Sequence, residues 1–253
     1  MVIPNNTSNQ PQRLYGDLAW IWPIISPPQD YAEETEHFCR LIREQSRIEV
    51  KTLLDLGRGG GHNDFTLKKH FELTGVDAST AMLALAKQLN PDVAYSCGDM
   101  RTVQLGKTFD AVTIFDSISY MTKEEDLRAA FASAFMHLEP GGVFLTFAEE
   151  TSERFEQNRT RCSKHAQSGV EIILVENIFD PDPTDTMYVT TFVFLIRRGE
   201  QFKVETDRHL SGIFKMEVWL GLLREIGFKV MQSEFTPPGL EGKSIPMFVC
   251  LKS

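Results

Sequence analysis

Apolar positions between residues 31 and 150 follow two alternating patterns, short apolar runs and longer segments with helical spacing. Residues 51–57 are typical of a buried strand, whereas residues 79–90 repeat apolar side chains at helical intervals after Ser79, a favoured N-cap residue, and stop at Pro91. Strands that alternate with helices indicate a parallel α/β sheet. The predicted strands are 51–57, 73–78, 93–98, 109–117 and 141–150, and the predicted helices are 31–47, 63–71, 79–90 and 124–138.

The pattern changes after residue 150, where three apolar runs follow one another with only short turns between them. Residues 169–180, 186–198 and 201–214 therefore predict an antiparallel β-meander. A helix at 215–227 and a closing pair of strands complete the chain. We divide the chain into a segment that helps to cover the site (1–30), an α/β core (31–150), a meander insertion or lid (151–214) and a closing helix with two strands (215–253).

The composition of the 253 residues is that of an ordinary soluble globular protein, with 42% hydrophobic and 24% charged residues. The formal net charge of −9 argues against a nucleic-acid partner, because phosphate binding requires a basic face. The densest cationic stretch, Arg159, Arg161 and Lys164, is too sparse to supply one, although an acidic protein can still carry a local basic groove. We therefore expect no nucleic acid as partner.

No apolar run approaches the ~20 residues of a membrane-spanning helix, and the polar residues 1–12 lack the features of a signal peptide. The four cysteines are far apart and form no metal-ligand spacing. Free thiols are typical of a reducing compartment, so we expect a cytoplasmic protein without a membrane or metal partner.

Glycines dominate residues 53–61, LLDLGRGGG, directly after a predicted buried strand. Asp55, Gly57, Gly59 and Gly61 form the pattern D-x-G-x-G-x-G, which differs in spacing from the G-x-G-x-x-G of dinucleotide-binding proteins. A glycine backbone can approach a ligand closely and present free N–H groups at the start of the next helix. The loop therefore predicts a ligand site, while an unusually tight turn without a ligand is the structural alternative.

Two further polar signals follow at the ends of the next two predicted strands. Asp77 lies roughly 20 residues after the loop, where a carboxylate can accept hydrogen bonds from ribose hydroxyls, although an acid at a helix start is also common for electrostatic reasons alone. Asp99 could bond an exocyclic amine, and Met100 could pack on an aromatic ring. Because all three signals lie at the carboxyl ends of successive strands, together they predict an adenosine-containing ligand.

Five stretches of the chain resemble successive motifs of the class I S-adenosylmethionine-dependent methyltransferases over about residues 50–148: LLDLGRGGG, VDAS, GDM, FDAVTIFDSISYM and LEPGGVFLTF. The resemblance implies a Rossmann-like, doubly wound seven-stranded sheet whose last strand pairs antiparallel at the sheet edge. It also implies S-adenosylmethionine as cofactor and S-adenosylhomocysteine as product. The residues expected to contact the cofactor are Tyr31, Asp55, Gly57, Arg58, Gly59, Gly61, Asp77, Ala78, Asp99, Met100, Phe115 and Asp116.

The resemblance also implies roles for these positions. The glycine loop surrounds the methionine part of the cofactor, Asp77 holds the ribose, and Asp99 and Met100 flank the adenine. Arg58 departs from the family pattern, which most often has a small residue there. Its guanidinium could pair with the cofactor carboxylate, extend into solvent or crowd the pocket. In the last case the protein would be a non-catalytic relic.

Shorter motifs resemble nucleotide-sugar N-methyltransferases, and they lie at residues 14–18, 30–31, 117–121 and 208–210. They imply an amine or amino-sugar nitrogen as the small-molecule methyl acceptor, with a small-molecule O-methyltransferase as the alternative. A nicotinamide-dependent oxidoreductase uses a similar sheet, but the glycine spacing disfavours it. We interpret the three tryptophans as packing residues: Trp20, Trp22 and Trp219.

Methylation of an amine requires the nitrogen to lose a proton, which a tyrosine, histidine or carboxylate within reach can accept. We predict Tyr15, Tyr120 and His209 as catalytic residues, although each could instead serve packing alone. Glu149 and Glu150 are further candidates for the base. The meander could also form the face of a homodimer, because exposed sheet edges need covering.

Overall fold

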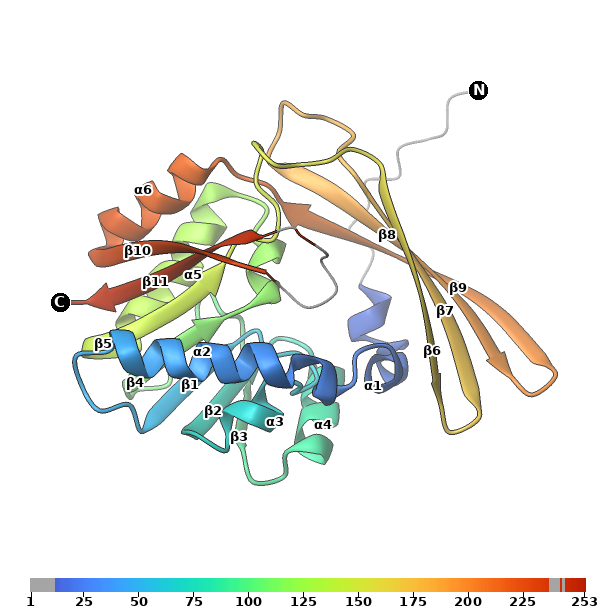
Figure 1. Cartoon of the computed structure of the whole chain (residues 1–253), viewed down its shortest axis with the longest axis horizontal. Helices are drawn as coiled ribbons and strands as arrows, with labels where there is room; N and C mark the ends of the chain where they lie inside the picture. Colours follow the sequence, from blue (N-terminus) through green and yellow to red (C-terminus); the bar gives the residue numbers. More distant parts are fainter. Residues whose placement is uncertain (1–11, 237–241, 243) are drawn as a thin grey trace.

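The computed structural model describes residues 12–236, 242 and 244–253 of the chain, which form two separate sheets with flanking helices (Figure 1). The strands of the larger sheet are β1 (Thr52–Leu56), β2 (Glu72–Asp77), β3 (Ala94–Cys97), β4 (Phe109–Ile114), β5 (Leu138–Phe147), β10 (Phe228–Phe235) and β11 (Ile245–Lys252). Their order is β10-β11-β5-β4-β1-β2-β3, and neighbours from β5 to β3 are parallel. The predicted doubly wound sheet is thus confirmed.

The last strand is antiparallel as expected, but it does not lie at the sheet edge. β11 lies between β5 and β10 and pairs antiparallel with both of them. Residues 245–250 of β11 are buried, whereas β10 carries exposed side chains such as Lys229. A strand that is buried throughout fits the interior of a sheet, and a strand with polar side chains fits its edge.

Helices cover both faces of the larger sheet (Figure 1). They are α2 (Ala32–Gln45), α3 (Asp64–Leu67), α4 (Thr80–Leu89), α5 (Glu124–Met136) and α6 (Met216–Ile226). Successive side chains of a strand point to opposite faces. Leu54 packs in one apolar cluster with Phe131 of α5 and Trp219 of α6, and Leu53 packs in the other with Phe38 of α2. The sheet therefore forms the middle of three layers.

Local signals fix several helix ends. Ser79 caps α4 as predicted, because its Oγ accepts a hydrogen bond from the amide of Met82 at 3.1 Å. Gly227 ends α6 with a φ of 115°, in the left-handed region that glycine adopts readily. The helix predicted over 63–71 is shorter, since α3 ends at Leu67 and the chain continues in turns.

The smaller sheet is antiparallel and has four strands where three were predicted. In sheet order they are β6 (Arg159–Gln167), β7 (Val170–Phe179), β8 (Met187–Arg198) and β9 (Gln201–Gly212). The additional strand, β6, has the sequence RTRCSKHAQ and no buried residue. Its edge position explains the absence of an apolar pattern, because pairing with β7 alone holds it in the sheet.

The N-terminal part of the described chain lies between the two sheets (Figure 1). It contains four short helices: η1 (Arg13–Tyr15), η2 (Ala19–Ile21), α1 (Trp22–Ile25) and η3 (Pro28–Tyr31), of which α1 is an α-helix and the others are 3-10 helices. Leu14, Leu18 and Ile21 pack with Ile172 and Phe194 of the smaller sheet in one buried cluster. No helix in the described part of the chain is long and apolar enough to cross a membrane.

Candidate active site

A cavity of about 460 Å³ opens at the carboxyl ends of β1, β2, β3 and β4. This is the side of a doubly wound sheet on which ligands bind, at the point where the strand order reverses between β1 and β4. Most of the predicted cofactor residues line it: Asp55, Gly57, Arg58, Gly59, Asp77, Ala78, Asp99, Met100, Phe115 and Asp116.

The glycine loop is held against the end of β2 by its own amides. The amide of Gly57 donates to the Val76 carbonyl at 2.7 Å, and the amide of Gly59 donates to the Asp77 carboxylate at 2.7 Å. Gly57 has a φ of 71°, and a Cβ there would overlap Ser117 and Met100. Only glycine allows this path, so the loop forms a cradle whose main chain faces the cavity.

Asp77 connects the loop with the start of α4. Its Oδ2 accepts from Gly59, and its Oδ1 accepts from the amide of Ser79 at 2.8 Å. Each carboxylate oxygen has a second lone-pair direction, so both can still accept from a ribose hydroxyl. The residue lines the cavity at the expected place, and its contact with ribose stays a prediction.

Asp99 already has a cationic partner. Arg101 lies 2.5 Å from its carboxylate and extends to Asp126 at 2.7 Å. Hydrogen bonds from Arg101 lower the pKa of Asp99, so the carboxylate is anionic and can accept from an amine only beside this guanidinium. Binding of the adenine amine by Asp99 therefore stays a prediction.

Two of the predicted cofactor residues lie outside the lining of this cavity. Gly61 packs against α4, where a Cβ would approach Asn90 and Ala86. Tyr31 lines a second cavity instead, and its hydroxyl is hydrogen-bonded to Ser26. The sequence could not show that these two residues lie outside the cavity. The path of η3 places Tyr31 in the second cavity, and packing against α4 holds Gly61 away from the first.

Arg58 turns away from the cavity into the protein interior. Its side chain is fully buried, although 7% of the whole residue is exposed, so only its main chain reaches the cavity. Its Nη2 lies 2.9 Å from Asp64 Oδ2, and its guanidinium stacks over the Tyr95 ring at 4.8 Å. Tyr95 in turn donates to Asp64 at 2.9 Å. The guanidinium thus neither extends into solvent nor occupies the cavity.

The buried Arg58–Asp64 pair also affects the loop carboxylate Asp55. Burial and the neighbouring charge of Asp64 raise the pKa of Asp55 well above its ordinary value. Thr113 of β4 donates to Asp55 at 3.0 Å. A carboxyl at the end of β1 is thereby fixed between two strands below the glycine loop.

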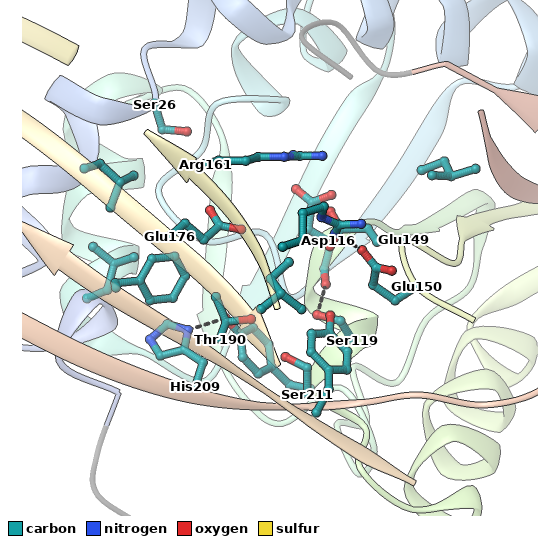
Figure 2. Close-up of a pocket in the computed structure, with 18 of the residues that line it drawn as sticks. Ser26, Asp116, Ser119, Glu149, Glu150, Arg161, Glu176, Thr190, His209 and Ser211 are labelled. Atoms are coloured by element: carbon teal, nitrogen blue, oxygen red, sulfur yellow. Dashed lines mark hydrogen bonds and ion pairs between the residues drawn. The ribbon is translucent and has the colours of Figure 1, made fainter. Parts of the chain in front are cut away.

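A second cavity, of about 510 Å³, lies between the core and the smaller sheet (Figure 2). Four residues line both cavities, namely Tyr15, Trp22, Asp116 and Tyr120. We name this shared wall the junction. A molecule in the second cavity can approach the first one here, which is the arrangement that a transfer reaction between two bound molecules needs.

Trp22 fastens the N-terminal segment to the glycine loop. Its indole Nε1 donates to His62 Nδ1 at 3.0 Å, and a Cβ on Gly60 would meet its ring. Burial, together with the nearby Arg58, lowers the pKa of His62 to about 4, so its Nδ1 is free to accept. From sequence Trp22 was interpreted as a packing residue, and its position at both cavities was missed.

The junction side of the second cavity is acidic. Asp116 and Glu149 expose much of their surface to the cavity, and neither forms an ion pair with another described residue (Figure 2). Because this surface lies inside a cavity, the surrounding protein raises the pKa of both carboxyls, and the interaction with Asp116 raises that of Glu149 further. Together they favour a shared proton or a cationic ligand over two negative charges.

The three predicted catalytic residues meet in one hydrogen-bonded chain. The Tyr15 and Tyr120 hydroxyls lie 2.6 Å apart, and the Tyr120 hydroxyl lies 2.8 Å from His209 Nδ1. His209 Nε2 lies 2.8 Å from Asp207 Oδ2. Asp207 was not predicted, although its spacing of two residues from His209 on a strand places both side chains on one face.

Comparison with known proteins agrees with this site. The model of a family described as a methyltransferase domain matches residues 53–142. The dTDP-3-amino-3,4,6-trideoxy-α-D-glucopyranose N,N-dimethyltransferase of Streptomyces venezuelae is 39% identical over 213 residues, which cover 83% of this chain and 89% of the relative. The corresponding dTDP-3-amino-3,6-dideoxy enzyme of Streptomyces fradiae is 28% identical over 240 residues, with 93% and 92% covered.

Solved structures are similar over nearly the whole chain. Streptomyces venezuelae DesVI matches with a TM-score of 0.82 and 27% identity, over 94% of this chain and 96% of that one. The S-adenosylmethionine-bound amino pentose methyltransferase CalS10 of Micromonospora echinaspora matches with a TM-score of 0.79 and 25% identity, over 98% and 100%.

The chain therefore belongs to the class I S-adenosylmethionine-dependent methyltransferases, and within that class it lies near the nucleotide-sugar N-methyltransferases. It is an enzyme whose cofactor is S-adenosylmethionine. The glycine loop, which has no room for a Cβ at Gly57 and exposes its main chain to the cavity, fits that cofactor. These relatives favour methyl transfer over the hydride transfer of a nicotinamide enzyme.

Proposed function

We propose that the protein methylates the amine nitrogen of a sugar that is linked to a nucleoside diphosphate. The observation that carries this proposal is the junction, where a cavity with a cofactor cradle meets a second, larger cavity. Two relatives are N,N-dimethyltransferases of dTDP-linked amino sugars, which supports the same class of acceptor here. One of the similar solved structures is that of an amino pentose methyltransferase.

The acidic side of the second cavity suits the amine end of such an acceptor. A sugar amine arrives largely as an ammonium ion, and Asp116 and Glu149 offer it a negative site without a competing cation among the described residues. Asp116 also lines the cofactor cavity, so an amine held there is next to the methyl donor. Recognition and alignment would thus be achieved by the same carboxyls.

The basic side of the cavity suits the diphosphate end. Arg159 and Arg161 of β6 line the cavity, and Arg161 extends into it in Figure 2. Arg159 pairs with Glu150, which holds the guanidinium in place. Arginine can bind phosphate oxygens with two parallel hydrogen bonds. Both arginines belong to the stretch Arg159, Arg161 and Lys164, which has too few cations to form a nucleic-acid-binding face.

Methyl transfer requires mainly that the acceptor nitrogen, the methyl group and the sulfur lie in line. When bound, S-adenosylmethionine supplies an electrophilic methyl on a sulfonium, and the acceptor nitrogen displaces the sulfur as the N–C bond forms and the S–C bond breaks. The junction residues Tyr15, Trp22 and Tyr120 would exclude water from this path. An acceptor that arrives as an ammonium ion has no lone pair, so it must release a proton before its nitrogen attacks the methyl group.

The acceptor class is tested by mass spectrometry of the product. The purified protein is incubated with S-adenosylmethionine and dTDP-3-amino-3,4,6-trideoxy-α-D-glucopyranose, and in parallel with the counterpart that has a hydroxyl in place of the amine. We expect one or two methyl groups on the amine compound and none on the hydroxyl compound. Methylation of the hydroxyl compound would favour the O-methyltransferase alternative, and reaction with neither would reject this acceptor class.

Three expectations from the sequence remain predictions: a cytoplasmic location, the absence of a nucleic-acid partner, and a homodimer formed through the meander. The smaller sheet has exposed apolar residues such as Phe202 and Val204, which are compatible with a dimer face.

A further inference from the structure

We propose that Tyr15, Tyr120, His209 and Asp207 form a proton relay that removes a proton from the acceptor ammonium before methyl transfer and delivers it to the imidazole of His209. The relay rests on the proposed function, since it requires an amine at the junction. Tyr15 and Tyr120 line both cavities and would be the residues that contact the acceptor. His209 is 1% exposed, and Asp207 is a positioning residue behind it.

Asp207 sets the direction of the hydrogen bonds. Its carboxylate accepts from the Leu14 amide at 2.6 Å and from the Arg208 amide at 2.8 Å. Burial alone would raise the pKa of Asp207, but the hydrogen bonds from His209 and the Leu14 amide lower it. An anionic carboxylate has no proton to donate, so His209 Nε2–H must be the donor to it.

The proton on His209 Nε2 determines where the hydroxyl protons of Tyr120 and Tyr15 point. With its proton on Nε2, His209 presents an unprotonated Nδ1, which accepts from the Tyr120 hydroxyl. The Tyr120 oxygen then accepts from the Tyr15 hydroxyl. The Tyr15 oxygen keeps a lone pair for an N–H donor at the junction. The chain thus points from the reacting nitrogen towards the buried imidazole.

The proton moves from the ammonium to His209 without leaving a charge on either tyrosine. The ammonium gives its proton to the Tyr15 oxygen as Tyr15 gives its own to Tyr120, and Tyr120 gives its own to His209 Nδ1. Both phenols end neutral, the acceptor amine is neutral and has a lone pair for the attack, and an imidazolium stands beside the Asp207 carboxylate. The three proton transfers need to occur together, because a stepwise transfer would form a tyrosinate. Burial raises the pKa of both Tyr15 and Tyr120 above the ordinary value, which disfavours that anion.

Residues from several elements surround His209. Asp207 lies on the same strand, and Glu176 of β7 faces the same cavity. Tyr15 and Tyr120 pack on it from η1 and η4 (Asp116–Tyr120), and Phe192 of β8 covers it with ring centroids 4.8 Å apart. His209 also lines the second cavity, so it can lose the proton to water after the product leaves.

The test is the pH profile of kcat in the wild type and in two variants. His209→Gln removes the proton acceptor, and Tyr120→Phe removes one hydroxyl while it keeps the ring. We expect kcat at neutral pH to fall roughly 100-fold in both, the usual size of a general-base contribution. The wild-type acid limb should disappear in His209→Gln, while binding of S-adenosylhomocysteine stays unchanged. The matched control is His165→Gln, at a half-buried position of β6 that lines neither cavity.

A packing role would give a different result. If both variants keep the wild-type kcat and pH profile, or if they lose cofactor binding along with activity, the relay is wrong. Failure of the proposed function is recognised separately, because the wild-type protein itself would then leave the amino sugar unmethylated. The relay is supported only when the wild type is active and kcat falls in both variants with KM for the cofactor preserved.

Discussion

Replacing Asp64 by alanine is expected to lower the free energy of unfolding by about 3–5 kcal/mol. The variant would leave the Arg58 guanidinium buried without its counter-charge, because both side chains of the pair are fully buried. Tyr95 would lose its hydrogen-bond acceptor as well. Urea denaturation at neutral pH, followed by tryptophan fluorescence, measures the change. The loss is a large part of the ~5–15 kcal/mol that stabilises a typical domain.

Two further variants show whether the buried charge is the cause. Asp92→Ala removes one partner of the exposed Lys68–Asp92 pair, and we expect its unfolding midpoint to match the wild type. The double variant Arg58→Met with Asp64→Asn removes both charges and keeps an acceptor for Tyr95, so it should recover most of the stability. If Asp64→Ala is no less stable than Asp92→Ala, the account of Arg58 is wrong.

Replacing Asp77 by alanine is expected to weaken binding of S-adenosylmethionine about 100-fold, as the loss of two hydrogen bonds to a carboxylate would do. The carboxylate is expected to hold the ribose, and it also holds the amides of Gly59 and Ser79. Calorimetric titration measures the affinity, and kcat at saturating cofactor should change much less.

Glu72→Ala is the matched control for Asp77→Ala, since Glu72 is an exposed residue at the other end of the same strand. Its cofactor affinity should equal that of the wild type. An Asp77→Ala protein that is folded and binds the cofactor as tightly as the wild type would remove Asp77 from the cofactor site.

The place of the site was predictable from the sequence, because the signals lay at the ends of parallel strands. The glycine loop, Asp77 and Asp99 follow β1, β2 and β3, and parallel strands bring their carboxyl ends to one edge. Strand β6 was not predictable from an apolar pattern, since its side chains are largely exposed and its pairing with β7 holds it in place.

The unpredicted features depend on contacts between distant parts of the chain. Asp207 acquires its role from the Leu14 amide and, through His209, from Tyr120. Leu14 and Tyr120 are both far from Asp207 in sequence. The direction of Arg58 depends on Asp64 and Tyr95, which surround it only in the folded protein. The tryptophan at position 22 looked like a packing residue until the N-terminal segment was seen on the glycine loop.

The most direct test of the account is calorimetric titration of the wild-type protein with S-adenosylmethionine and, separately, with S-adenosylhomocysteine. The burial of Arg58 away from the cavity predicts an open site and a dissociation constant in about the micromolar range, which corresponds to roughly −8 kcal/mol. A folded protein that shows no binding up to about millimolar cofactor, roughly −4 kcal/mol, would contradict the account and favour a non-catalytic relic.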